Sequence, residues 1–145
     1  MLIESSPGMK KKEVSVKITV VKGKLVDAKA EAIILALFER EKRLSGAAAE
    51  VDAKSGGIIT DIIKSGDFEA KPSQVSMIYS RSLPAKRIAL VGFGKKSELT
   101  LEKIRRAFAK VMQELRGWRV QKAAVSLDMS LLTGQKGKIV SAAME

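Results

Sequence analysis

The chain has 145 residues, a formal net charge of +11, and neither histidine nor cysteine. These absences exclude disulfides, zinc sites built from imidazole or thiolate, and the Ser–His and Cys–His pairs of nucleophilic enzymes. Carboxylate and lysine chemistry, a hard-cation site with oxygen ligands, or no catalysis in this chain remain open.

The sequence of the N-terminal part predicts one leader segment and two strands. Residues 1–12 are predicted to be a flexible basic leader that ends in three lysines. Apolar and polar residues alternate from Val14 to Val20, which indicates a half-exposed strand. The nearly continuous apolar run from Ala30 to Leu37 is typical of a strand covered on both faces of a sheet.

Helices and strands are predicted to alternate through the rest of the chain. Two short helices are expected, Ala47–Lys54 with Ser45 as its cap, and one whose apolar face carries Ile58, Ile59, Ile62 and Ile63 and which ends at Ser65-Gly66. Strands are predicted at Gln74–Tyr79, Arg87–Val91 and Lys122–Leu127, with a long amphipathic helix between the last two, capped by Thr100. This alternation predicts a layered α/β fold with a mixed, mainly parallel sheet flanked by helices.

Two small-residue segments are candidate anion sites. Gly92-Phe93-Gly94 has only two of the three glycines of a dinucleotide loop, which favours a tight turn over a phosphate cradle. Ser45, Gly46 and Ala47 form the better candidate anion or nucleotide loop, because small residues at a helix N-terminus expose backbone N–H groups. The alternative for this loop is close packing of the helix on the sheet.

The charged residues suggest a second kind of partner. The excess of basic residues, 27 against 16 acidic, is typical of contact with nucleic acid or another anionic surface. The candidate contacts are Lys95, Lys96, Arg105, Arg106, Arg116, Arg119 and Lys122. The alternative is that these side chains form an ordinary solvated face. No carboxylate spacing forces two into one site, so a solvated surface is expected for most of Glu31, Glu39, Glu41, Glu50, Asp52, Asp61, Asp67 and Glu69.

Several stretches together resemble the N-terminal domain of cytosol (leucyl) aminopeptidases. They are Ala30–Ile34, Phe38–Asp52, Gly57–Phe68, Leu83–Lys95 and Leu99–Ala107, in the family's order and spacing. The resemblance covers about residues 13–128 and implies a three-layer macrodomain-like fold there. It also implies that residues 129–145 are a linker and the cut start of a linker helix. The positions where macrodomains carry ADP-ribose-binding asparagines and a triple-glycine loop, near Leu35–Phe38 and Ser45–Ala47, lack those residues.

The resemblance places catalysis outside this chain. In that family two divalent metal ions, zinc or manganese, lie in a separate C-terminal domain with lysine, aspartate and glutamate ligands, and no residue here matches that motif. The chain is therefore expected to be a non-catalytic domain, without metal or cofactor, that helps a cytoplasmic hexamer to assemble and shapes access to the catalytic domain. No apolar run approaches the roughly 20 residues of a membrane span. The alternative is a nucleic-acid-binding or nucleotide-binding macro-like module.

Overall fold

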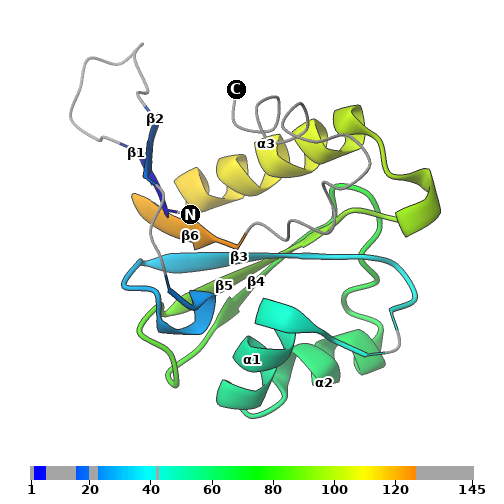
Figure 1. The fold of residues 1–145 in the computed structure, drawn as a ribbon, viewed down its shortest axis with the longest axis horizontal. Coiled ribbons are helices and arrows are strands. Elements are labelled where there is room, and N and C mark those ends of the chain that lie inside the picture. Colours follow the sequence, from blue (N-terminus) through cyan, green and yellow to red (C-terminus); the bar gives the residue numbers. More distant parts are fainter. Residues whose placement is uncertain (1, 6–15, 20–22, 42, 127–145) are drawn as a thin grey trace.

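A computed structural model describes residues 2–5, 16–19, 23–41 and 43–126. Six strands form one sheet in the order β2-β1-β6-β3-β5-β4. Helices α1 and α2 cover one face of this sheet and α3 covers the other, which gives three layers (Figure 1). The elements are β1 Leu2–Ser5, β2 Val16–Thr19, β3 Ala32–Leu37, α1 Gly46–Lys54, α2 Ile58–Ser65, β4 Val75–Tyr79, β5 Arg87–Gly92, α3 Leu101–Gly117 and β6 Lys122–Val125, with 3-10 turns at Leu25–Asp27 and Lys96–Glu98.

The sheet is mixed, as predicted, but it is not mainly parallel, because three of its five described strand pairs are antiparallel; the two parallel pairs lie at the centre. β3 runs parallel to both β5 and β6. The outer pairs, β1 with β2, β1 with β6 and β4 with β5, are antiparallel. Parallel neighbours need a long crossover, and the chain supplies one through α1, α2 and β4 and another through α3. The parallel strands therefore present their carboxyl ends along one edge, where the segments after β3 and β5 meet.

Two hydrophobic clusters fill the space on either side of the sheet. The cluster beneath α1 and α2 is built around Ile33, Ile59 and Leu90, each fully buried or nearly so. The cluster beneath α3 is built around Ile34, Val91, Val111 and their neighbours. Residues of β3 alternate between the two clusters, which confirms that this strand is covered on both faces. None of the helices in the described part of the chain is long and apolar enough to cross a membrane.

The predicted helix boundaries are confirmed within one residue. The hydroxyl oxygen of Thr100 accepts a hydrogen bond from the Lys103 N–H at 3.2 Å, and α3 begins at the next residue, Leu101. Ser45 is the N-cap residue of α1, but its side chain makes no capping hydrogen bond. Gly66 ends α2 in the left-handed conformation with φ of 85°, which glycine adopts without steric cost.

The prediction of a leader over residues 1–12 is wrong for its first part. Leu2–Ser5 form β1, which pairs with β2 on one side and with β6 on the other. Four residues are too few to show an alternating pattern, and the pairing with β6 joins segments far apart in the sequence. Residues 1 and 6–12 of that prediction lie outside the described residues. So do the ends of the strands expected at 14–20 and 122–127 and the linker expected at 129–145.

The N-terminus of α2 is capped by a side chain of the preceding helix, α1. Asp52 Oδ1 accepts hydrogen bonds from the backbone N–H groups of Ile59 (2.8 Å) and Thr60 (3.1 Å). Its second oxygen, Oδ2, accepts from the Thr60 hydroxyl at 2.5 Å. The residue in the normal capping position, Gly57, has no side chain to do this. The expectation of a solvated surface carboxylate is therefore wrong for Asp52, which joins the end of α1 to the start of α2.

Candidate functional site

The Gly92-Phe93-Gly94 segment, at the end of β5, uses all three of its N–H groups in hydrogen bonds within the protein. The three N–H groups donate to the carbonyl oxygens of Gln74 (2.8 Å), Leu37 (2.9 Å) and Ala70 (2.9 Å). All three residues of the segment are buried. A phosphate cradle needs free N–H groups that point at the ligand. These groups are already used, which argues against a phosphate cradle. The segment runs on from the end of β5 and no hydrogen bond closes a turn within it, so the tight-turn prediction is not confirmed.

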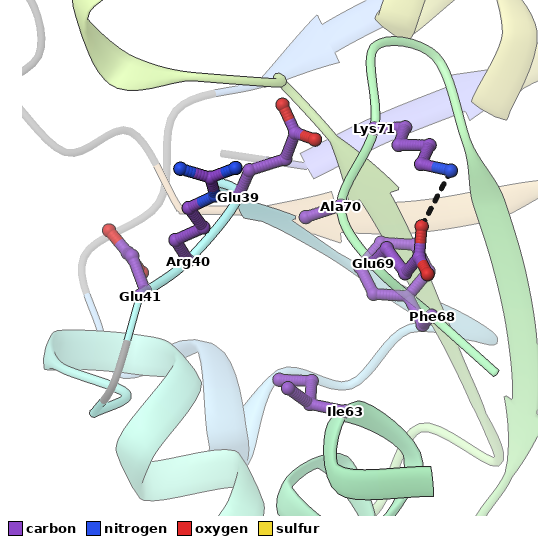
Figure 2. A pocket seen from close by; sticks show the side chains of 8 residues that line it. All are labelled: Glu39, Arg40, Glu41, Ile63, Phe68, Glu69, Ala70 and Lys71. Carbon is purple, nitrogen blue, oxygen red and sulfur yellow. Dashed lines mark ion pairs between the residues drawn. The ribbon is translucent and has the colours of Figure 1, made fainter. Parts of the chain in front are cut away.

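This segment helps to position a pocket with charged walls. The N–H of Glu39 donates to the Gly94 carbonyl at 2.9 Å, which fixes the segment that leaves β3. Facing it, the side-chain oxygen of Gln74 accepts from the N–H groups of Glu69 (3.1 Å) and Lys71 (3.2 Å) and shapes the segment before β4. The two segments and the end of α2 enclose a pocket of about 390 Å³ (Figure 2) lined by Glu39, Arg40, Glu41, Ile63, Phe68, Glu69, Ala70 and Lys71.

The floor of this pocket is apolar and its walls are charged. Phe68 is almost fully buried and Ile63 half-buried. The Lys71 Nζ lies 2.6 Å from Glu69 Oε2, and both side chains are more than half exposed. That hydrogen bond raises the pKa of the Lys71 ammonium, and the negative charges of Glu69 and then Glu39 act in the same direction.

Across the pocket, Glu41 stands in a different environment. Partial burial raises the pKa of its carboxyl group, because a less hydrated site disfavours the charged form, and the positive charge of Lys96 opposes this effect. The lining contains three carboxylates and two cations, so its summed formal charge is negative although the chain as a whole is strongly positive. The carboxylates Glu39, Glu41 and Glu69 can accept hydrogen bonds from a small group that carries a positive charge.

Sequence reasoning missed this gathering of carboxylates. Glu39 and Glu41 follow β3, and Glu69 comes from the segment before β4, so their spacing along the chain carries no signal. The one available indication was that Glu39 follows a buried parallel strand, where α/β proteins place ligand-binding groups. Among the described residues no three acidic side chains are arranged to hold a metal ion. The residues present therefore do not fit a metal centre.

The predicted anion loop lies elsewhere. Ser45 and Gly46 are exposed at the start of α1, and Ala47 is half-buried against the cluster beneath that helix. None of the three lines the pocket. Gly46 has a φ of 57°, a left-handed conformation that suits glycine and is rarely adopted by other residues. Anion binding at Ser45, Gly46 and Ala47 remains a prediction.

The predicted nucleic-acid contacts follow α3 from end to end. Lys95 and Lys96 precede the helix, Arg105, Arg106 and Arg116 lie on its exposed side, and Arg119 and Lys122 follow it. A helix of 17 residues is about 25 Å long, so the structure spreads these cations over a strip rather than gathering them in one pocket. Acidic side chains interrupt the strip, since Arg106 pairs with Glu102 at 3.0 Å. Nucleic-acid contact also remains a prediction.

Comparison with known proteins identifies the family. A model described as the N-terminal domain of the cytosol aminopeptidase family matches residues 34–145. The chain belongs to this family. A probable cytosol aminopeptidase of Alkaliphilus oremlandii is 36% identical over 126 residues, which are 82% of this chain and 25% of that protein. A relative from Bacillus subtilis is 37% identical over 99 residues, 68% of this chain and 20% of its own length.

The fold of this aminopeptidase domain is that of a macrodomain. The macrodomain of Mycobacterium tuberculosis DarG superposes with a TM-score of 0.64 at 17% identity, covering 88% of this chain and 90% of that one. Identity at this level shows the fold alone. The family resemblance and the three-layer macrodomain-like architecture predicted from the sequence are both confirmed. The chain spans about a quarter of the length of the aminopeptidases that it matches.

Proposed function

We propose that this chain acts as a non-catalytic N-terminal domain of a cytoplasmic aminopeptidase. In the whole protein, a separate catalytic domain would bind two divalent metal ions, zinc or manganese, and hydrolyse N-terminal amino acids from peptides. The domain described here would help a hexamer to assemble and would shape access to that catalytic domain. The observation that carries the proposal is the match of residues 34–145 to the N-terminal domain of the family.

The pocket chemistry supports an accessory role near peptide substrates. Its carboxylates, Glu39, Glu41 and Glu69, suit a cationic group, and Phe68 and Ile63 offer an apolar floor. A peptide with a free N-terminus carries an ammonium group next to its first side chain, and this pairing matches the pocket better than a phosphate does. The walls contain no nucleophile activated by a neighbouring base, which hydrolysis by this chain alone would need.

The catalytic part of the proposal is tested with the purified chain. We expect no turnover of a leucyl chromogenic amide above the buffer blank, with manganese or zinc added in separate assays. The full-length Bacillus subtilis relative serves as the positive control. Turnover that remains proportional to the amount of chain after repeated purification would contradict a non-catalytic role.

The assembly part needs a separate measurement. The matching N-terminal segment of the Bacillus subtilis relative is deleted or replaced by this chain, and the mass of each product is measured in solution. We expect the deletion to lower the oligomeric state and the replacement to restore it. A deletion product with the mass and activity of the parent would rule out both assembly and access roles.

A second candidate function is contact with nucleic acid along α3. The observation that favours it is the strip of exposed cations over about 25 Å, a length that matches roughly seven base pairs of duplex at 3.4 Å per step. If the strip binds phosphates, the logarithm of affinity falls linearly with the logarithm of salt concentration, by about 0.9 for each phosphate contact.

Two variants that each remove positive charge test whether α3 contacts nucleic acid. The double variant Lys95→Ala and Lys96→Ala is expected to reduce the salt slope by about 2 in a titration of labelled duplex. Lys54→Ala, which removes an exposed cation from α1 on the opposite face of the sheet, is the control and should leave the slope unchanged. Absence of binding at low salt, or equal loss in all variants, would dispose of this candidate.

A further inference from the structure

Strand β4 forms one end of the sheet, with β5 on one side and no described strand on the other. Two hydrogen bonds show which residues of β4 point their backbone N–H and C=O groups toward β5. The Gly92 N–H donates to the Gln74 carbonyl at 2.8 Å, and the Ser80 N–H donates to the Lys86 carbonyl at 2.8 Å. Both pairs follow the register that joins β4 to β5. Since bonding alternates along an antiparallel strand, the even-numbered residues of β4 face β5.

The odd-numbered residues therefore face the open edge. Val75, Met77 and Tyr79 turn their backbone N–H and C=O groups away from β5, and no described segment hydrogen-bonds to them there. A row of unpaired donors and acceptors of this kind is a template for an added strand. The edge thus offers three donors and three acceptors, in the spacing of a β ladder.

This edge lacks the protection that sheet edges commonly have. Natural proteins discourage pairing at an edge with charged side chains, above all lysine. In this chain 30% of the residues are charged, yet the segment from Pro72 to Ser80 contains none. A strand that approaches β4 therefore meets no charge on the strand itself.

One exposed aromatic side chain, Tyr79, lies on the edge strand itself, and a second, Trp118, contacts Arg87 of the neighbouring strand β5. Tyr79 and Trp118 are the large apolar side chains that are exposed in the described residues, at 58% and 48%. Arg87 lies between them, because it pairs with Tyr79 across the strands and its guanidinium carbon lies 4.3 Å from the Trp118 ring centroid. Tyrosine, tryptophan and arginine are the residues most enriched at energetically important interface positions.

We propose that the β4 edge is a self-association surface, on which β4 of a second copy pairs in antiparallel orientation. A two-fold axis through Met77 would set it against the partner's Met77, and Val75 against the partner's Tyr79. Residues whose backbone groups face away from β5 then pair only with the same residues of the second copy. The new ladder forms about six hydrogen bonds and leaves none of the N–H and C=O groups of Val75, Met77 and Tyr79 unpaired. The proposal does not depend on the aminopeptidase role of the domain.

The symmetry of the strand favours a second copy over an unrelated partner. The outward positions at its two ends, Val75 and Tyr79, form a β-branched and aromatic pair when two copies align, and such cross-strand pairs are favourable. Because β4 carries no charge, it has no electrostatic preference for a basic or an acidic segment of another protein. For the same reason, pairing of β4 with β4 of a second copy brings no like charges together. The nearest charged residues are Lys71 and Arg81, which flank the uncharged segment along the chain, and Arg87, which pairs with Tyr79 from β5.

The first test is hydrogen exchange on the unaltered chain at several concentrations. Sedimentation at about 0.15 M salt, where charges beyond roughly 8 Å are screened, is expected to show a monomer–dimer equilibrium. The amides of Val75, Met77 and Tyr79 should exchange rapidly when the chain is dilute and slow at least tenfold as the dimer forms. Those of Ser76 and Ile78, already bonded to β5, should change little.

Two charge-matched variants provide the second test. Tyr79→Lys places a cation on the edge and is expected to weaken dimerisation at least tenfold. Gln113→Lys adds the same charge on the exposed side of α3 and should leave it unchanged. A chain that remains monomeric up to millimolar concentration, or a dimer in which the three outward amides still exchange rapidly, would overturn the proposal. Equal weakening by both lysines would also overturn it, since that result indicates general charge repulsion.

Discussion

Replacing Gly92 by alanine is expected to destabilise the fold by about 3 kcal/mol or more, because the new methyl group would meet backbone rather than a movable side chain. A Cβ at this position would lie 2.5 Å from the carbonyl carbon and 2.6 Å from the oxygen of Ala70, and closer still to the Lys71 carbonyl oxygen. The loop cannot simply withdraw, since the Ser73 N–H donates to the Gly92 carbonyl at 2.9 Å. Urea denaturation measures the loss as a lower midpoint.

Gly117 provides the matched control for that experiment. It ends α3, and an added Cβ would have no heavy atom within 4 Å. Gly117→Ala is therefore expected to change the stability by no more than about 1 kcal/mol, in the favourable direction, through the reduced entropy of the unfolded chain. If Gly92→Ala unfolds at the same urea concentration as Gly117→Ala, the close approach of the loop to β5 is not as described here.

The layers of the fold were predictable because their signals are local and repeated. β3 and β5 show as apolar runs, and α3 shows as an apolar stripe behind the Thr100 cap. The prediction failed where a strand depends on pairing between segments far apart in the sequence. Leu2–Ser5 form a strand by pairing with β2 on one side and, on the other, with β6, which lies more than a hundred residues later. The role of Gly92 was also hidden, since the two-glycine pattern cannot reveal that the backbone at Ala70 lies against it.

The pocket was less predictable than the fold for a related reason. Glu39, Glu41 and Glu69 are unremarkable in sequence. They share a site because the Gly94 carbonyl and the Gln74 side chain hold their two segments face to face. Small residues at a helix start, such as Ser45 and Gly46, attract attention in a sequence because they resemble a ligand loop. The structure leaves them exposed and outside the pocket.

Asp52 is the second position where a single substitution should have a large effect. Its carboxylate accepts three hydrogen bonds from the first turn of α2, two from backbone N–H groups that have no partner within the helix. Asp52→Ala removes all three and is expected to destabilise the chain by about 2–3 kcal/mol, as for the loss of a charged cap. Asp52→Asn keeps one acceptor oxygen and should cost roughly 1 kcal/mol.

The control is Glu50→Ala, which removes the same charge from the exposed side of α1 without loss of a hydrogen bond to α2. This variant should change the stability by about 0.5 kcal/mol or less. Hydrogen exchange locates the effect, because the amides of Ile59 and Thr60 should exchange faster in Asp52→Ala and remain protected in Glu50→Ala. Equal stability of the two alanine variants would show that α2 does not depend on this cap. Since Ile63 at the far end of α2 lines the pocket, loss of the cap is also expected to loosen one wall of the site.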